Sequence, residues 1–121
     1  MVRFVIGGLE KNQIKQEIEK AGGDQVEAVV STDFEGAKKI KANEADYYIG
    51  ACNSGGGAAL SVVIGILGYN NCSTVAKAGG RPKQETIEKL VKEGKLAFGT
   101  AVESIDTAVP MIVEEILKNR G

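Results

Sequence analysis

The sequence predicts an α/β fold in which helices cover both faces of a parallel sheet. Two observations carry this prediction. Short apolar runs of strand length alternate with stretches of helix length along nearly the whole 121-residue chain. The loops between them are short, and strands that alternate with helices in this way form parallel sheets. The length fits a single domain over residues 1–121.

The first two strand–helix pairs follow from hydrophobic spacing and capping signals. Residues 2–6 are an apolar strand closed by two glycines, and residues 10–21 carry their isoleucines on one helical face. Residues 26–30 are a second apolar run. A Thr-Asp-Phe-Glu capping box then opens a helix over about residues 32–42.

The third strand and helix are the least polar part of the chain. Residues 45–51 form the strand, and residues 58–68 form a helix that is apolar on every side. We expect this helix to be buried on nearly every side, with one face against another subunit, which predicts a homo-oligomer. Residues 47–69 carry no charge, but the glycines at 55–57 interrupt any continuous helix, so we expect no membrane insertion.

The last two strand–helix pairs complete the pattern. Residues 72–76 and 96–99 are short strands, and residues 84–93 form an amphipathic helix. The final helix covers about residues 106–119, which places Pro110 in its first turn, where the missing N–H costs little. Together these elements predict a three-layer, doubly wound, five-stranded parallel sheet of the flavodoxin or Rossmann type, with strand order 2-1-3-4-5.

Composition excludes several classes of function. The net charge is −1 and basic residues form no stripe, so we expect no nucleic-acid partner. Histidine is absent, which removes the commonest general base and metal ligand, and we expect no metal and no cofactor. The two cysteines fit neither a zinc site nor a disulfide, and we interpret Cys72 as a packing residue. The N-terminus enters a strand without a signal peptide, which predicts a cytoplasmic protein.

A glycine-rich loop after the third strand is the candidate binding site. Its sequence is Cys52-Asn53-Ser54-Gly55-Gly56-Gly57. In a doubly wound sheet, ligands bind beyond the carboxyl ends of strands 1 and 3, where this loop meets Gly7-Gly8. Glycines let the backbone approach a ligand, and the amides that begin the next helix attract phosphate or carboxylate. The alternative is a tight strand-to-helix turn that needs small residues.

Side chains around this loop add chemistry. Cys52 is the candidate catalytic residue, because a helix N-terminus favours the thiolate; the alternative is a small buried residue at a strand end. Lys77 and Arg81 follow the fourth strand and would neutralise a phosphate or carboxylate, unless they are ordinary solvated loop residues. Asp33 and Glu103 are candidates for contacts with ligand hydroxyls, and a helix-cap role is favoured for Asp33.

Three stretches of the chain match a known family. They are Asp46-Tyr-Tyr-Ile-Gly-Ala-Cys-Asn-Ser-Gly-Gly-Gly-Ala-Ala-Leu-Ser61, Thr74-Val-Ala-Lys77 and Gly94-Lys-Leu-Ala-Phe-Gly99. On these residues, nearly the whole chain resembles the YhfU-type family, which consists of small bacterial proteins of unknown function. Such proteins resemble members of metabolic gene clusters that include transport and amino-acid-type enzymes, which implies a role with small molecules.

The stretch from Glu44 to Ser61 is also similar to the third-strand loop of the RpiB/LacAB sugar-phosphate isomerases. Those proteins carry a cysteine, a glycine-threonine-glycine turn and an apolar helix there. The resemblance implies that Cys52 is a base and that residues 53–57 hold an anionic enediolate. The chain departs from that family where Asn53-Ser54 replaces the glycine-threonine pair and Gly7-Gly8 replaces an aspartate-histidine pair. Because the chain has no histidine, the resemblance implies the fold and the anion loop but not the isomerase activity.

Three functions are therefore open for the loop. The first is binding of a small anionic metabolite without catalysis. The second is an isomerase-like enzyme that uses Cys52 as a base. The third is a phosphocysteine carrier of the sugar phosphotransferase kind, although such carriers usually place their cysteine after strand 1.

Overall fold

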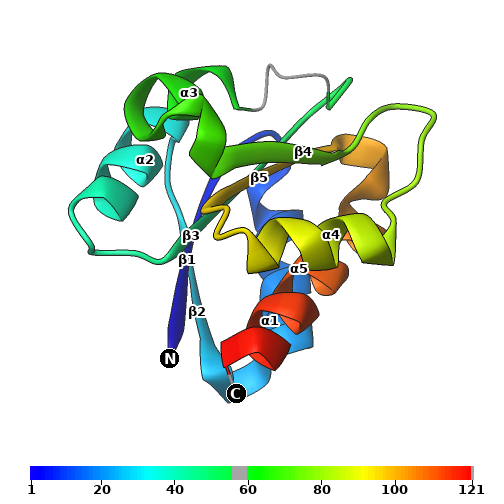
Figure 1. Ribbon diagram of the computed structural model, residues 1–121, viewed down its shortest axis with the longest axis horizontal. Helices are drawn as coiled ribbons and strands as arrows, with labels where there is room; N and C mark the ends of the chain where they lie inside the picture. Colours follow the sequence, from blue (N-terminus) through cyan, green and yellow to red (C-terminus); the bar gives the residue numbers. More distant parts are fainter. Residues whose placement is uncertain (56–59, 121) are drawn as a thin grey trace.

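The computed structural model describes residues 1–55 and 60–120, and it contains the predicted alternation of strands and helices. Figure 1 shows a central sheet, which is parallel throughout, with helices packed around it. The strands are β1 (Val2–Gly8), β2 (Val26–Val30), β3 (Tyr47–Cys52), β4 (Cys72–Ala76) and β5 (Ala97–Ala101). The helices are α1 (Lys11–Gly22), α2 (Asp33–Lys41), α3 (Ser61–Leu67), α4 (Gln84–Lys92) and α5 (Ile105–Arg120).

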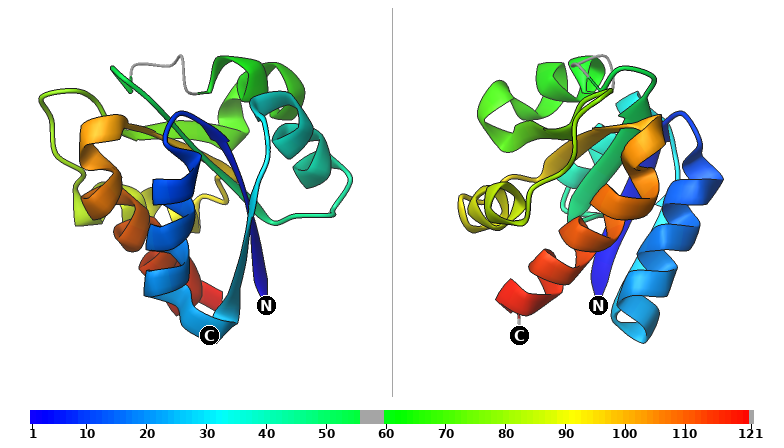
Figure 2. Two further views of the ribbon diagram at one scale, coloured as in Figure 1. Left: turned by 180° about the vertical axis from the view of Figure 1, so that it is seen from behind. Right: turned by 90° about the vertical axis from the view of Figure 1, so that its right-hand side faces the viewer.

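The helices form a layer on each face of the sheet, which confirms the three-layer α/β class (Figure 2). On one face, α1, α4 and α5 bury side chains such as Ile14, Ile87 and Ile112 against the strands. On the other face, α2 and α3 cover a smaller apolar cluster that contains Ala37 and Val63. The sheet therefore separates two hydrophobic cores.

The predicted strand order was wrong at one edge of the sheet. The observed order is β2-β1-β3-β5-β4, so β5 is inserted between β3 and β4. All five residues of β5 are buried, whereas Ser73 and Thr74 of β4 are only half-buried. A strand that is covered on both faces belongs inside the sheet, and a partly polar strand belongs at its edge. The chain therefore passes from β3 through α3 to the edge strand β4. It then returns through α4, on the opposite face of the sheet, to β5, as right-handed crossovers require.

Two predictions about the helices also need correction. The last helix begins at Ile105, so Pro110 lies in its second turn rather than its first. The third helix is not buried on nearly every side: in its described part Val63 is fully buried, while Val62 and Gly65 are exposed. Residues 58 and 59, which we assigned to this helix, lie outside the described residues. The short α3 thus leaves apolar side chains on the surface.

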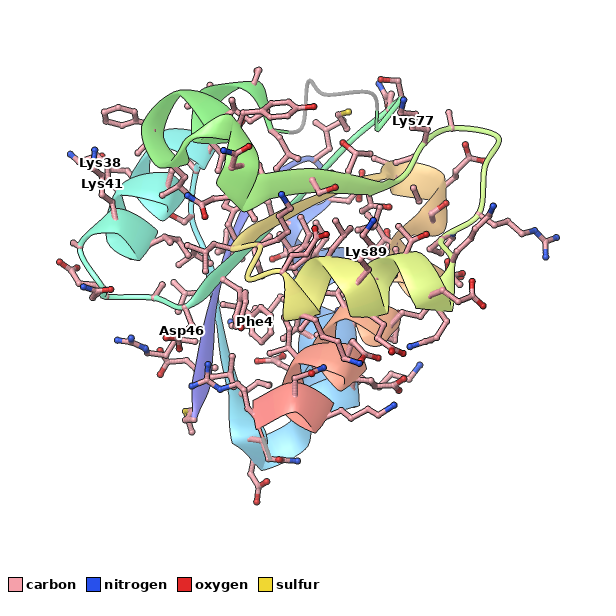
Figure 3. The ribbon with its side chains drawn as sticks, in the orientation of Figure 1. Phe4, Lys38, Lys41, Asp46, Lys77 and Lys89 are labelled. Atoms are coloured by element: carbon pink, nitrogen blue, oxygen red, sulfur yellow. The ribbon has the colours of Figure 1, made fainter. Side chains whose placement is uncertain are left out.

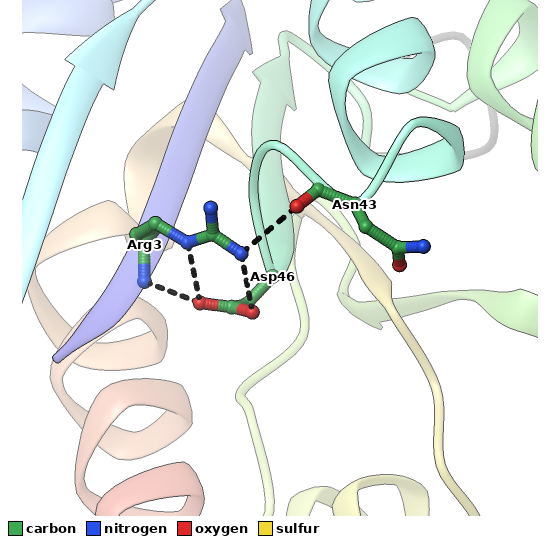
Figure 4. Close-up of polar contacts among 3 residues, drawn as sticks. All are labelled: Arg3, Asn43 and Asp46. Atoms are coloured by element: carbon green, nitrogen blue, oxygen red, sulfur yellow. Dashed lines mark hydrogen bonds and ion pairs between the residues drawn. The ribbon is translucent and has the colours of Figure 1, made fainter.

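An ion pair fastens the amino-terminal edge of the sheet, opposite the candidate site (Figure 4). The Arg3 guanidinium donates to both carboxylate oxygens of Asp46 at 3.2 Å, and the Arg3 backbone N–H donates to Asp46 Oδ2 at 2.8 Å. The guanidinium also donates to the Asn43 carbonyl. Because Asp46 immediately precedes β3, these bonds align the starts of β1 and β3 and help to set the register of the two strands.

Candidate functional site

The candidate site lies at the carboxyl edge of the sheet, where β1 and β3 end side by side. The chain leaves β1 toward β2 on one side and leaves β3 toward β4 on the other, so this is the switch point of the sheet. Gly8 pairs with Ala51 across the two strand ends, and Cys52 follows as the last residue of β3. Side chains alternate between faces along a strand, which puts Cys52 on the same face as Tyr48, under α2 and α3.

Cys52 is half-buried, and the loop that follows curls around its sulfur. The Gly55 N–H donates to Cys52 Sγ at 3.0 Å, and Ser54 Oγ lies 3.8 Å from the same sulfur. Gly55 has a φ of 68°, and a Cβ there would overlap backbone atoms of Ala76 and Ala101 at the ends of β4 and β5. Close packing therefore explains Gly55, and its amide faces the thiol sulfur, where it favours negative charge.

Lys77 is brought to this loop by the backbone. The Ala78 N–H donates to the Ser54 carbonyl at 2.8 Å, which joins the loop after β4 to the loop after β3. Figure 3 shows Lys77 beside the end of β3, and its side chain is exposed. Asn53 and Ser54 are exposed as well. Gly56 and Gly57, which we also predicted to bind the ligand, lie outside the described residues.

Arg81 lies in a different place from Lys77. It lines a hollow of about 590 Å³ between the loop after β4 and the first turn of α5, together with Glu103 and Asp106. Glu103 accepts a hydrogen bond from the Gly79 N–H at 2.9 Å, so its carboxylate holds the Lys77–Lys83 loop in place. The structure therefore brings Lys77 to the Cys52 loop and places Arg81 among acidic groups.

Packing explains Gly7 and Gly8, which we predicted as ligand contacts. A Cβ at Gly7 would overlap the Asp33 carboxylate and the Tyr48 hydroxyl. Gly8 has a φ of 73°, and a Cβ there would overlap the backbone of Ala51. The Gly8 N–H already donates to Asp33 Oδ1 at 2.8 Å, and the Leu9 N–H donates to the Ala51 carbonyl. These two amides have protein acceptors, and the adjacent carboxylate repels anions, so the β1 turn offers little to a phosphate.

Asp33 is not the helix cap that we favoured. Thr32 caps α2, because its hydroxyl accepts a hydrogen bond from the Glu35 N–H at 3.0 Å. The Asp33 side chain instead turns toward the end of β1, where Oδ1 accepts from both Gly8 and Tyr48. The capping-box sequence correctly predicted where the helix begins, but it did not show where the carboxylate points.

Tyr48 is the important residue that sequence reasoning missed. Its ring is fully buried, and its hydroxyl donates to Asp33 Oδ1 at 2.8 Å. A Cβ at Gly7 or Gly50 in the sheet would overlap Tyr48, and a Cβ at Gly36 in α2 would press on the other side of the ring. Burial, reinforced by the Asp33 carboxylate, raises the pKa of the Tyr48 hydroxyl far above its ordinary value, so it acts as a donor only. Glycines inside both a strand and a helix are the sequence signal for such a ring.

The second cysteine has the structural role that we predicted. Cys72 is buried, its thiol donates to the Gly68 carbonyl at 3.4 Å, and burial raises the pKa of the thiol. Cys52 and Cys72 do not form a disulfide with each other. Within residues 1–55 and 60–120, no group of acidic or cysteine side chains has the arrangement of a metal site, and no helix has the length and apolar character needed to cross a membrane.

The site thus combines a half-buried thiol, a constrained carboxylate and an exposed amine along one edge of the sheet. Asp33 lies at the end of β1, Cys52 ends β3, and Lys77 approaches from β4. Such a row can bind a molecule that has a hydroxyl-bearing part and an anionic part, and the thiol between them, once ionised to the thiolate, can accept a proton. The chain contains no histidine, which is the residue that most often transfers protons in enzymes.

Solved structures with the same fold include two sugar-phosphate enzymes. The type B ribose 5-phosphate isomerase of Trypanosoma cruzi superposes with a TM-score of 0.67, over 98% of this chain and 84% of that protein, at 13% identity. Ribose-5-phosphate isomerase B of Giardia lamblia gives a TM-score of 0.66, over 97% of this chain and 94% of that protein, at 11% identity. At these identities the comparison establishes the fold.

Sequence comparison gives much closer relatives. The uncharacterized protein YhfU of Escherichia coli K12 and that of Shigella flexneri are each 44% identical to this chain over 116 residues, which cover 96% of this chain and 99% of the relative. The model of the family described as "Protein of unknown function DUF2620" matches residues 2–116. The chain therefore belongs to the DUF2620 family, with the fold of the type B ribose 5-phosphate isomerases.

Proposed function

We propose that this protein binds a small metabolite carrying a phosphate or carboxylate at the loop that begins with Cys52. The observation that carries the proposal is the hydrogen bond between Ala78 and Ser54, because it brings Lys77 to the carboxyl end of β3. Asn53 and Ser54 are exposed polar residues of the loop that this hydrogen bond joins to the Lys77 segment. An ammonium group next to hydroxyl and amide donors is suited to an anionic ligand.

The fold supports a sugar phosphate as the first ligand to test. The two solved structures with this fold are named as ribose 5-phosphate isomerases. A ligand of that class has an anionic end for Lys77 and hydroxyls for the opposite end of the site. Ribose 5-phosphate is therefore the probe, and inorganic phosphate separates recognition of the anion from recognition of the sugar.

Calorimetric titration of the wild type and two lysine variants tests this proposal. We expect ribose 5-phosphate to bind the wild type, and Lys77→Ala to weaken binding by about tenfold, because one charge-assisted contact is lost. Lys41→Ala is the matched control, since Lys41 is an exposed lysine on α2, far from Lys77 in Figure 3. Equal affinities for the Lys77→Ala and Lys41→Ala variants, or a wild type that binds neither probe, would contradict the proposal.

A second candidate function is aldose–ketose isomerisation with Cys52 as the base. The observation that favours it is the half-exposed thiol at the end of β3, whose sulfur accepts the Gly55 N–H. In this reaction the thiolate takes the C2 proton of the aldose, and the C–H electron pair forms the C1–C2 double bond of an enediolate. The proton of the C2 hydroxyl passes to the C1 oxygen, and the thiol returns its proton to C1 as the C2 carbonyl forms.

Proton exchange measured by NMR distinguishes catalysis from binding. If Cys52 is a base, ribose 5-phosphate in D₂O loses its C2 proton signal in the presence of the wild type, and Cys52→Ser abolishes the exchange. Cys72→Ser should exchange like the wild type, because Cys72 is buried against the Gly68 carbonyl. Binding without exchange would leave the protein as a binding protein and exclude Cys52 as a base for this substrate.

A further inference from the structure

The Asp33 carboxylate has one oxygen held by the protein and one oxygen open. Oδ1 accepts hydrogen bonds from the Tyr48 hydroxyl and the Gly8 N–H, both at 2.8 Å. Among the residues that the structure describes, no donor is bonded to Oδ2. Asp33 is half-buried, and Oδ2 is the carboxylate oxygen that has no donor of the described residues to satisfy it.

The surroundings fix the carboxylate in place rather than merely accommodating it. The Tyr48 ring is fully buried between glycines of β1 and β3 and Gly36 of α2, so its hydroxyl has little freedom. Gly7 lacks a Cβ where Asp33 Oδ1 lies. A group with two strong donors on one oxygen is preorganised, and a preorganised acceptor binds a ligand at a lower entropic cost.

Asp33 and Cys52 belong to the same side of the sheet. Tyr48 and Cys52 share a face of β3, and the Tyr48 hydroxyl is the group that meets Asp33. The Asp33 carboxylate contacts Gly8 at the end of β1, and Cys52 is the last residue of β3. β1 and β3 are paired, and paired strands lie about 4.8 Å apart, so the two side chains lie at adjacent strand ends. Lys77 reaches this edge from β4, on the far side of Cys52.

We infer that Asp33 is the specificity-determining residue of the proposed site and binds a hydroxyl group of a polyol or sugar ligand through Oδ2. The inference rests on the proposed function, and it also orients the ligand: the hydroxyl end lies at β1, and the anionic end lies toward Lys77. A carboxylate only accepts hydrogen bonds when it is ionised, so it attracts hydroxyl donors and repels a second phosphate. Tyr48 is the positioning residue that holds the acceptor.

Asp33→Asn tests the inference with little change in shape. The Gly8 N–H can only donate, so the asparagine amide oxygen should keep the Oδ1 position, and an NH₂ group should replace Oδ2. The open acceptor thereby becomes a donor. Glu35→Gln is the matched control, because it removes an equal charge from an exposed residue of the same helical turn. Tyr48→Phe keeps the charge and removes only the positioning hydroxyl.

Affinities for ribose 5-phosphate and for inorganic phosphate are measured by calorimetry on each variant, with thermal melts to verify folding. We expect Asp33→Asn to weaken ribose 5-phosphate about tenfold or more, because a hydrogen bond to a charged acceptor is lost, and to leave inorganic phosphate unchanged or tighter. Tyr48→Phe should weaken ribose 5-phosphate less, and Glu35→Gln should change neither affinity.

The outcomes separate this inference from the proposed function. If the wild type and the Asp33→Asn variant bind ribose 5-phosphate with equal affinity while the Lys77→Ala variant binds it more weakly, Asp33 does not have the inferred role. The proposed binding site would still stand. Equal weakening of both probes by Asp33→Asn would show a structural effect and also overturn it. A wild type that binds neither probe would contradict the proposed function, and the inference would fail with it.

Discussion

At the scale of single residues, the two cysteines have opposite environments. Cys52 is half-exposed at the end of β3, whereas Cys72 is buried and its thiol donates to a backbone carbonyl. The thiolate is the reactive form of cysteine, so exposure and nearby donors decide reactivity. The same residue type thus serves a candidate site in one position and core packing in the other.

We predict that iodoacetamide modifies Cys52 and spares Cys72 in the folded protein. Burial raises the pKa of Cys72 and blocks access to it, while the Cys52 sulfur accepts an amide N–H. Peptide mass spectrometry after limited alkylation measures the two sites separately, and the denatured protein, in which both should react, is the control. Modification of Cys72 at the rate of Cys52 would contradict the environments described above.

Glycine substitutions test the packing around Tyr48. We expect Gly50→Ala to lower the free energy of unfolding by about 1–3 kcal/mol, because the new methyl group overlaps the buried ring. Gly65→Ala is the control: it lies on exposed α3 with open space around it, so alanine should be neutral or raise stability by up to about 1 kcal/mol. Chemical denaturation of both variants measures the difference, and equal stabilities would refute the packing explanation.

At the scale of elements, the sequence predicted the bounds of the strands better than it predicted their order in the sheet. Residues 26–30 and 72–76 were predicted with the observed bounds, because both are short runs of strand length with β-branched residues and lie between turn or capping signals. The position of β5 was missed, although its burial and the polar residues of β4 hold that information. The Tyr48–Asp33 bond was missed because it joins residues of different elements, and periodicity does not report such contacts.

The candidate site was predictable only in part for the same reason. The end of β3 follows from local sequence, so the position of Cys52 at the switch point was predicted correctly. Lys77 and Arg81 looked equivalent in the sequence, but a backbone hydrogen bond brings one to the loop and leaves the other in a separate hollow. Gly7 leaves room for Asp33 and Tyr48, and a Cβ at Gly8 would overlap the backbone of Ala51, so packing accounts for both glycines, and their contact with a ligand stays a prediction.

The ion pair at the opposite edge predicts a pH dependence of stability. Burial alone would raise the pKa of Asp46, but the hydrogen bonds and charge of Arg3 outweigh it and hold the pKa below its ordinary value of 3.8. A lowered pKa in the folded state adds stability above pH 3.8, and this contribution is lost as the pH falls through the folded value. The wild type should therefore exceed Asp46→Asn in stability at pH 5–7, by a margin that shrinks below about pH 4.

Thermal melts across this pH range measure the margin. Asp24→Asn is the control, because Asp24 is exposed and accepts no hydrogen bond within the described part of the chain. Its difference from the wild type should stay small. A margin for Asp46→Asn that is equal at pH 3 and pH 7 would show that the ion pair does not set this dependence.

At the scale of the whole molecule, an apolar surface extends over α3 and the turn after it. Val62 is 43% exposed and Tyr69 is 77% exposed. β4, the strand that follows, is a sheet edge that carries no charged residue. An uncharged edge beside exposed apolar side chains is suited to contact with a second copy of the chain.

We predict a homo-oligomer that Val62→Lys dissociates, because a lysine at the contact would bury an unpaired charge. Val30→Lys is the control, since Val30 is 42% exposed at the opposite edge of the sheet, on β2. Sedimentation velocity over a range of concentrations reports the oligomeric state of each protein. A wild type that remains monomeric, or equal dissociation by both variants, would contradict a contact through α3.

The most direct measurement of the central claim is a map of backbone amide shifts on addition of ribose 5-phosphate. The proposed site lies at the carboxyl edge of the sheet, so the largest changes in amide chemical shift should occur at Asn53 to Gly55, at Ala78 and at Gly8. The opposite edge has its own hollow of about 400 Å³, lined in part by Gln25 and Arg120. Shifts confined to that edge would contradict the account.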